Sequence, residues 1–119
     1  KNTMQDFRNL KVWQKAHELA LLAYKVTADF PREEMFGLRH SIRKTAVDIP
    51  ASIAEGAGKA KDAEFAASIN YALSLAMRME YFALVACDLE LMDHDSYNIF
   101  SGKIVEVKKM LGGFRKTLA

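Results

Sequence analysis

The chain has 119 residues, half of them hydrophobic, and 17 Lys and Arg against 15 Asp and Glu leave a formal net charge of +2. This length fits one domain that buries its own core, and the hydrophobic content excludes a disordered chain. A single cysteine excludes an intrachain disulfide and a thiolate metal cluster. The first residues lack the apolar core of a secretory signal, and no apolar run could cross a bilayer, so we expect a cytoplasmic protein with no membrane partner.

Two helices are predicted in the first half of the chain. The first covers about residues 10–28, begins after Asn9 as its N-cap, and keeps its apolar residues at a three-four spacing. The second covers about residues 37–58 and keeps one apolar face from Leu38 to Ala57, straight through Pro50. Proline in a helix interior costs about 3 kcal/mol. Because a break would usually reset the phase of the apolar face, we expect one helix with a kink at Pro50.

Two further helices are predicted in the second half. The third covers about residues 63–91 with Asp62 as its N-cap, and it is apolar on two faces. The first face consists of Ile69, Leu73, Ala76, Leu84, Cys87 and Leu91. The second face consists of Tyr71, Leu75, Phe82, Val85 and Leu89. Two apolar faces need two surfaces to pack against, which favours a homo-oligomer.

The fourth helix, about residues 96–118, has a heptad-like seam that Gly112 and Gly113 weaken locally. Short connections between four helices predict an all-α, up-and-down four-helix bundle with a proline-kinked second helix. We expect a single domain over residues 1–119.

Catalytic chemistry has little support in the sequence. The three histidines lie in different segments, and no HExxH motif or paired Glu-x-x-His motif occurs. We therefore expect no enzyme activity, no catalytic residues, no metal site and no cofactor. Cys87 is interpreted as a core residue, and Glu80, within an apolar face, as the partner of a basic residue on another helix or subunit. Tyr and Phe fall on apolar faces, so no base-stacking platform is expected.

The basic residues are denser in the first half of the chain, which carries 11 Lys and Arg against 7 Asp and Glu up to residue 61. The densest cluster consists of Arg39, Arg43, Lys44, Lys59 and Lys61. Arg39 and Arg43 are four residues apart and share a helix face. Such a stripe would suit phosphate groups. The alternative is a solvated helix face with Asp48 and Glu55 as internal neutralising charges.

One block of sequence resembles a known family. It consists of Ile49, Pro50, Ile53, Ala54, Glu55 and Gly56, and further matches lie at residues 7–16, 30–31, 36–38, 42–44 and 64–65. These residues resemble the bacterial four-helix-bundle family whose genes include reading frames inside intervening sequences of large-subunit ribosomal RNA. Ser41, Asp48 and Ser52 depart from residues common in the family, so any site built from those positions would be altered.

The resemblance implies a homo-oligomeric ring, with a pentamer as the expected arrangement. It also extends to the accessory protein of diversity-generating retroelements, a basic ring that works with a reverse transcriptase and nucleic acid. The leading hypothesis is a non-catalytic module that binds the backbone of RNA or DNA, or associates with ribosomal RNA, through the five basic residues. The alternative is a self-assembling scaffold whose partner is another protein of unknown identity. For Glu55 we expect a structural pairing, and the alternatives are that it caps a neighbouring chain or is simply solvated.

Overall fold

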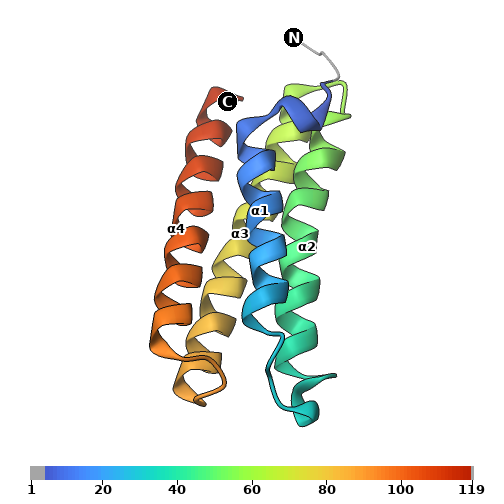
Figure 1. Cartoon of the computed structure of the whole chain (residues 1–119). Helices are drawn as coiled ribbons and strands as arrows, with labels where there is room; N and C mark the ends of the chain where they lie inside the picture. Colours follow the sequence, from blue (N-terminus) through green and yellow to red (C-terminus); the bar gives the residue numbers. More distant parts are fainter. Residues whose placement is uncertain (1–4, 119) are drawn as a thin grey trace.

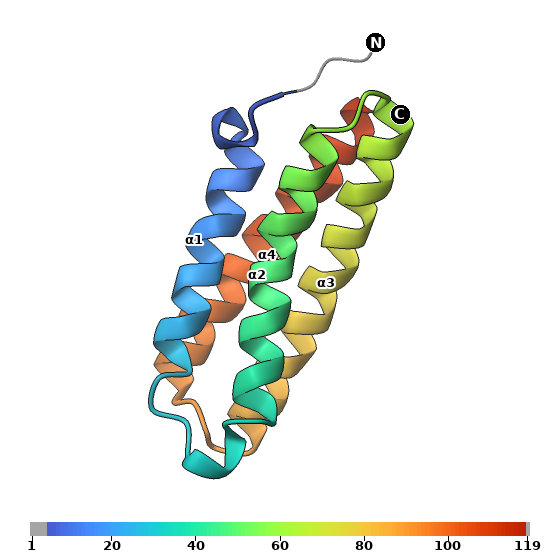
Figure 2. The same ribbon diagram turned by 90° about the vertical axis from the view of Figure 1, so that its right-hand side faces the viewer.

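The computed structural model describes residues 5–118, which form four long helices. These are α1 (Lys11–Val26), α2 (Leu38–Ala57), α3 (Asp62–Asp88) and α4 (His94–Thr117), with short 3-10 turns η1 (Phe7–Asn9) and η2 (Arg32–Glu34) before α1 and α2. Successive helices run in opposite directions in an elongated bundle of 47 × 23 × 20 Å (Figures 1 and 2). The predicted all-α, up-and-down four-helix bundle is confirmed.

The core of the bundle is one continuous cluster to which all four helices contribute. Small residues on α1, such as Ala16 and Ala23, are fully buried and let the neighbouring helices approach closely. The predicted seam on α4 is confirmed, because its central residues Phe100, Ile104, Val107 and Leu111 are all buried. None of the described helices combines the length and the apolar character that a membrane span requires.

Helix starts were predicted less well than helix faces. Asn9 does not cap α1; it ends the turn η1, and Leu10 takes the N-cap position without a side-chain hydrogen bond. Asp62 is the first residue of α3 instead of its N-cap. At α4 the cap is Asp93, whose Oδ1 accepts a hydrogen bond from the Ser96 backbone N–H at 2.7 Å. At the first of these positions Asp6 accepts a hydrogen bond from the Arg8 backbone N–H and starts η1, so a polar side chain other than Asn9 takes the available donor.

Helix α2 continues through Pro50 without interruption, as predicted, while the kink itself stays a prediction. Ile49, Pro50 and Ile53 are buried. Gly56 is buried as well, and a Cβ added there would lie 2.7 Å from the Ser68 Cβ. The most distinctive block of the sequence is therefore the surface with which α2 packs against α3.

Two other members of this part of α2 lie nearer the solvent. Ala54 is half-buried, and the Glu55 side chain is exposed and makes no hydrogen bond or ion pair within residues 5–118. The structural pairing expected for Glu55 is thus not found inside this part of the chain. The corresponding expectation for Glu80 is confirmed, because Lys108 Nζ on α4 lies 2.7 Å from Glu80 Oε1.

Helix α3 does present two apolar faces, but their membership differs from the prediction. Leu75, assigned to the second face, is buried in the core, whereas Leu84, assigned to the first, is exposed. Large apolar side chains that remain between 42% and 63% exposed on α3 are Tyr71, Met77, Tyr81 and Leu84. Helical spacing alone cannot tell which of two apolar faces turns inward, because both have the same period.

Candidate functional site

A basic hollow opens where the last turn of α1 meets the first turns of α2. It has a volume of about 360 Å³ and is lined by Tyr24, Met35, Arg39, His40, Arg43 and Lys44. None of the described residues that line it carries a carboxylate. Three of the five basic residues singled out in the sequence thus meet at one place, joined by three neighbours that the sequence did not indicate.

Arg43 is the most constrained of these side chains. Its Nε donates to Thr27 Oγ1 at 2.8 Å, and its terminal nitrogen donates to the Tyr24 carbonyl at 3.1 Å. The guanidinium also lies 4.5 Å from the centre of the Tyr24 ring. The Thr27 hydroxyl in turn donates to the Ala23 carbonyl at 2.8 Å. Arg43 therefore places its positive charge at the carbonyl end of α1 and donates a hydrogen bond to a carbonyl there. The C-terminal end of a helix is a favourable place for a cation.

The surroundings of Arg43 contain more positive than negative charge. Burial lowers the pKa of Arg43, and the nearby positive charge of Arg39 lowers it further, while Tyr24 acts in the opposite direction. The guanidinium stays charged, because an arginine pKa lies far above neutrality. Two like charges without a carboxylate between them attract an anion, since a bound anion relieves their repulsion.

The other basic residues of the hollow, Arg39, His40 and Lys44, are all at least partly exposed. Lys44 pairs with Asp48 at 3.0 Å, but its side chain is 64% exposed, and ion pairs this exposed contribute little. His40 is exposed and Arg39 is half-buried. Glu34, on the loop before α2, accepts a hydrogen bond from the Leu38 N–H at 2.9 Å, so its carboxylate is already engaged.

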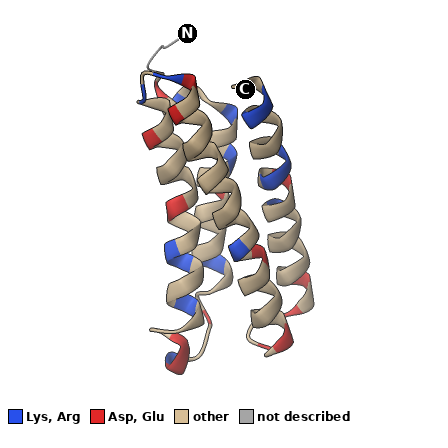
Figure 3. Ribbon diagram, turned by 180° about the vertical axis from the view of Figure 1, so that it is seen from behind, with Lys and Arg blue, Asp and Glu red and all other residues tan. Residues whose placement is uncertain are grey.

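The other two predicted basic residues lie elsewhere. Lys59 and Lys61 belong to the turn between α2 and α3, at the opposite end of α2. From Lys44 to Lys59 the chain rises about 22 Å along the helix axis. Figure 3 shows this separation as blue bands in the lower half of α2 and again at the far turn. A single cluster of all five residues is therefore not present on one protomer.

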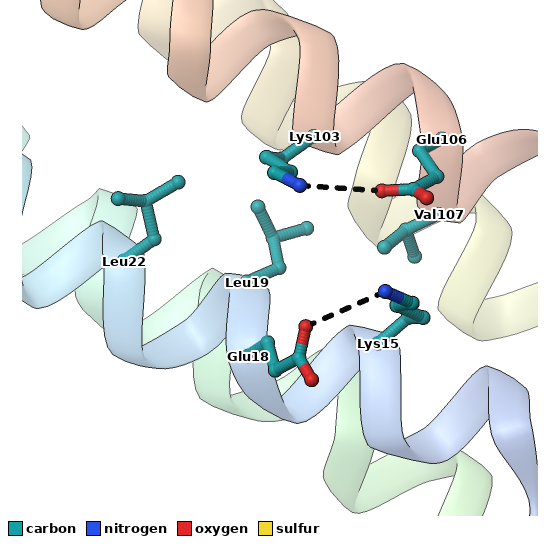
Figure 4. Close-up of a pocket in the computed structure, with 7 residues that line it drawn as sticks. All are labelled: Lys15, Glu18, Leu19, Leu22, Lys103, Glu106 and Val107. Atoms are coloured by element: carbon teal, nitrogen blue, oxygen red, sulfur yellow. Dashed lines mark ion pairs between the residues drawn. The ribbon is translucent and has the colours of Figure 1, made fainter.

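A second hollow, between α1 and α4, differs in charge. It measures about 200 Å³, and Leu19, Leu22 and Val107 contribute its apolar lining. Its lysines face glutamates on their own helices: Lys15 Nζ lies 3.8 Å from Glu18 Oε1, and Lys103 Nζ lies 3.9 Å from Glu106 Oε1 (Figure 4). Each rim is thus neutral, and this hollow offers no charge to an anion.

Metal binding and thiol chemistry depend on the His, Cys, Asp and Glu residues of the described chain. No group of three or more His, Cys, Asp or Glu between residues 5 and 118 is placed to hold a metal ion. Cys87 is half-buried, and its Sγ lies 3.8 Å from His94 Nδ1. The sequence placed Cys87 in the core, whereas it lies at the rim of the core.

One expectation about aromatic residues was wrong. Tyr and Phe were all assigned to apolar faces, yet Phe36 is 89% exposed and Tyr24, which lines the basic hollow, is 44% exposed. Phe36 directly follows Met35, another residue of the hollow. Sequence reasoning missed Phe36 because an aromatic residue just before a helix usually packs against it, as in a hydrophobic staple.

Comparisons with known proteins agree with the fold. A solved structure from Bacteroides thetaiotaomicron, described as a protein of unknown function from the S23 ribosomal protein family, has a TM-score of 0.80 over 88% of this chain and 98% of its own. The two sequences are 24% identical, so the likeness supports the fold alone. No curated protein matches the chain.

A family model gives the assignment. The model for the 23S rRNA-intervening sequence protein matches residues 8–113, a range that includes all of α1, α2 and α3 and most of α4. The match covers far more than half of the 119 residues, and the earlier resemblance pointed to the same family. The chain therefore belongs to the 23S rRNA-intervening sequence protein family.

Proposed function

We propose that this protein is a non-catalytic, homo-oligomeric module that binds the phosphate backbone of a nucleic acid at the basic hollow. The observation that carries the proposal is the meeting of Arg39, Arg43, Lys44 and His40 around one open space whose lining has no carboxylate. The family name refers to 23S rRNA, which makes RNA the first nucleic acid to test.

The side chains that line the hollow suit contacts to the nucleic-acid backbone better than contacts to base edges. Guanidinium and ammonium groups suit phosphate oxygens, and phosphate contacts position a nucleic acid without reading its sequence. We therefore expect binding that depends strongly on salt and weakly on sequence.

Self-assembly would strengthen this weak site. The exposed apolar side chains of α3, with Tyr81 63% and Tyr71 55% exposed, form a surface that a second copy could cover. Each additional protomer would add another basic hollow to the same particle, and linked sites bind one long ligand much more tightly than a single site does. A ring, with a pentamer as the expected form, is one assembly with this property.

The binding test compares two double variants in a titration of labelled RNA and duplex DNA at several salt concentrations. Arg39→Gln with Lys44→Gln removes two cations of the hollow but leaves Arg43, which holds the end of α1. Lys59→Gln with Lys61→Gln is the matched control, because it removes the same charge from the other end of α2.

We expect the first double variant to weaken binding and to reduce the slope of log affinity against log salt by about 1 to 2, since each phosphate contact contributes about 0.7 to 0.9. The control should change neither quantity by much. Absence of binding by the unaltered protein at low salt would refute the proposal. A loss confined to the Lys59 and Lys61 variant would instead place the contact at the other end of the bundle.

The second candidate is a self-assembling scaffold that binds another protein, and the same apolar surface of α3 favours it. Light scattering over a range of protein concentrations tests the assembly that both candidates require. A monomer at every concentration would contradict both. An assembled particle that binds no nucleic acid at low salt would favour the scaffold.

A further inference from the structure

Phe36 is the most exposed large hydrophobic side chain in the described part of the chain, at 89%. Aromatic side chains of this size are usually buried, since burying one stabilises a fold by about 1.5–3 kcal/mol. Phe36 makes no such contribution within its own chain. It lies next in sequence to Met35, which is 42% exposed and forms part of the wall of the basic hollow. The residue that carries this exposed aromatic ring is therefore joined directly to the wall of the basic hollow.

The loop that carries Phe36 is held in place by several hydrogen bonds. The Gly37 N–H donates to the Glu34 carbonyl at 3.1 Å, and the Leu38 N–H donates to Glu34 Oε1 at 2.9 Å. A Cβ at Gly37 would approach that same Oε1 to 2.8 Å, so glycine is the residue that lets the carboxylate bond the start of α2. Phe36 is thus presented from an ordered turn, which lowers the entropy lost on binding a ligand.

Tyr24 places a second aromatic ring at the hollow, with a different role. Its ring lies 4.5 Å from the Arg43 guanidinium, so one part of its surface is already covered by a cation. Its side chain is 44% exposed, and Tyr24 lines the hollow together with Arg39 and Lys44. The hollow therefore joins apolar ring surface to positive charge, and Phe36 directly follows one of its lining residues, Met35, in the chain.

We infer that this surface binds a single-stranded segment of nucleic acid, with an unpaired base stacked on Phe36 and the adjoining phosphates in the basic hollow. The inference rests on the proposed function and adds the kind of nucleic acid. An aromatic ring beside a cationic groove is the combination that binds single strands, because every unpaired base has a face to stack. The bases of a duplex are stacked on one another, so a duplex would use the cations and leave Phe36 unused.

The test uses four protein forms and three probes of equal length at low salt. The forms are the unaltered protein, Phe36→Ala, Phe36→Tyr and Ile99→Ala; Ile99 is a 58% exposed apolar residue on α4 and serves as the matched control. The probes are a labelled single-stranded RNA, its single-stranded DNA counterpart and the duplex RNA, followed by fluorescence anisotropy. A 2-aminopurine base in the single strands reports stacking directly, because its emission falls when an aromatic ring stacks on it.

We expect the single strands to bind more tightly than the duplex. Phe36→Ala should weaken single-strand binding about 5- to 100-fold, the usual effect of removing one stacking ring, and abolish the quenching of 2-aminopurine. Phe36→Tyr should keep both, and Ile99→Ala should change neither. Duplex binding should be the same in all four forms. The comparison of RNA with DNA shows whether the ribose hydroxyl contributes.

Two results would overturn the inference while the proposed function stands. One is equal binding of single strands and duplex that Phe36→Ala leaves unchanged. The other is a change of particle mass in light scattering on Phe36→Ala, with stacking unaffected, which would show that Phe36 packs against another copy of the chain. If no probe binds the unaltered protein, it is the proposed function itself that fails.

Discussion

The contact between α2 and α3 at Gly56 yields a sharp prediction about stability. Gly56 is buried, and an added Cβ would lie 2.7 Å from the Ser68 Cβ and 2.8 Å from the Phe65 Cδ1. To restore an ordinary contact of 3.4 Å, the two helices must separate by about 0.7 Å. The hydrogen bond from Ser52 Oγ to the Ser68 carbonyl, 2.8 Å long, crosses the same interface and would lengthen.

Two opposing effects determine how Gly56→Ala changes the free energy of unfolding. Alanine improves the helix propensity of α2 by about 1 kcal/mol. Overpacking a tight interior contact costs about 1–3 kcal/mol, and the backbone of α3 leaves little room for relaxation because Ser68 contributes its Cβ rather than a flexible end. We expect the contact to prevail, with a net destabilisation of up to about 2 kcal/mol once propensity is subtracted.

Thermal unfolding followed by circular dichroism checks this prediction at one fixed protein concentration, since assembly also shifts the transition. In a chain of this size each kcal/mol shifts the midpoint by about 4 °C, so the expected change lowers it by up to about 8 °C. Gly102→Ala is the matched control, because Gly102 lies inside α4 and an added Cβ there meets nothing within 4 Å. The control should therefore raise the midpoint.

A Gly56→Ala protein as stable as the Gly102→Ala protein would refute the reasoning. It would mean that α2 and α3 separate without cost at this point. The glycine at position 56 would then have no structural explanation in the packing of one chain.

Two further predictions concern helix ends. Thr27→Val removes the buried oxygen that accepts a hydrogen bond from Arg43 Nε, and we expect a loss of about 1–3 kcal/mol in chemical denaturation; an unchanged midpoint would contradict this role of Thr27. Hydrogen bonds from Ser96, with its backbone N–H first, lower the pKa of Asp93. The ionised form therefore stabilises the fold above the ordinary pKa of an aspartate, and that contribution is lost as pH falls through the lowered value. Below about pH 4, Asp93→Asn should thus lose less stability than the unaltered protein, and parallel melting profiles against pH would argue against the cap.

The sequence predicted the helix faces well because helical periodicity is a local property. The α4 seam from Phe100 to Leu111 and the apolar continuity of α2 through Pro50 both appear in the structure as expected. The helix starts were less predictable: Asn9 has the composition of a cap, yet Asp6 bonds the Arg8 N–H and starts a short turn in its place. Several polar side chains near a helix start compete for the same few donors.

The candidate site was only partly visible in the sequence. Arg39 and Arg43 could be placed on one face because they are four residues apart on a single helix. Tyr24 could not be added, since it lies on α1 and reaches the site only through the packing of α1 against α2. Nor could the role of Arg43 in bonding the end of α1 be predicted, because its partners lie 16 and 19 residues away.

By itself, the sequence determined four helices, the inward faces of α2 and α4, and the family, because spacing along one helix specifies which side chains share a face. Tertiary structure alone decided which of the two apolar faces of α3 turned inward and left Tyr81 exposed. It also separated Lys59 and Lys61 from the other basic residues and brought Tyr24 and Met35 to them. These outcomes depend on how whole helices pack side by side, and no spacing within one helix contains that information.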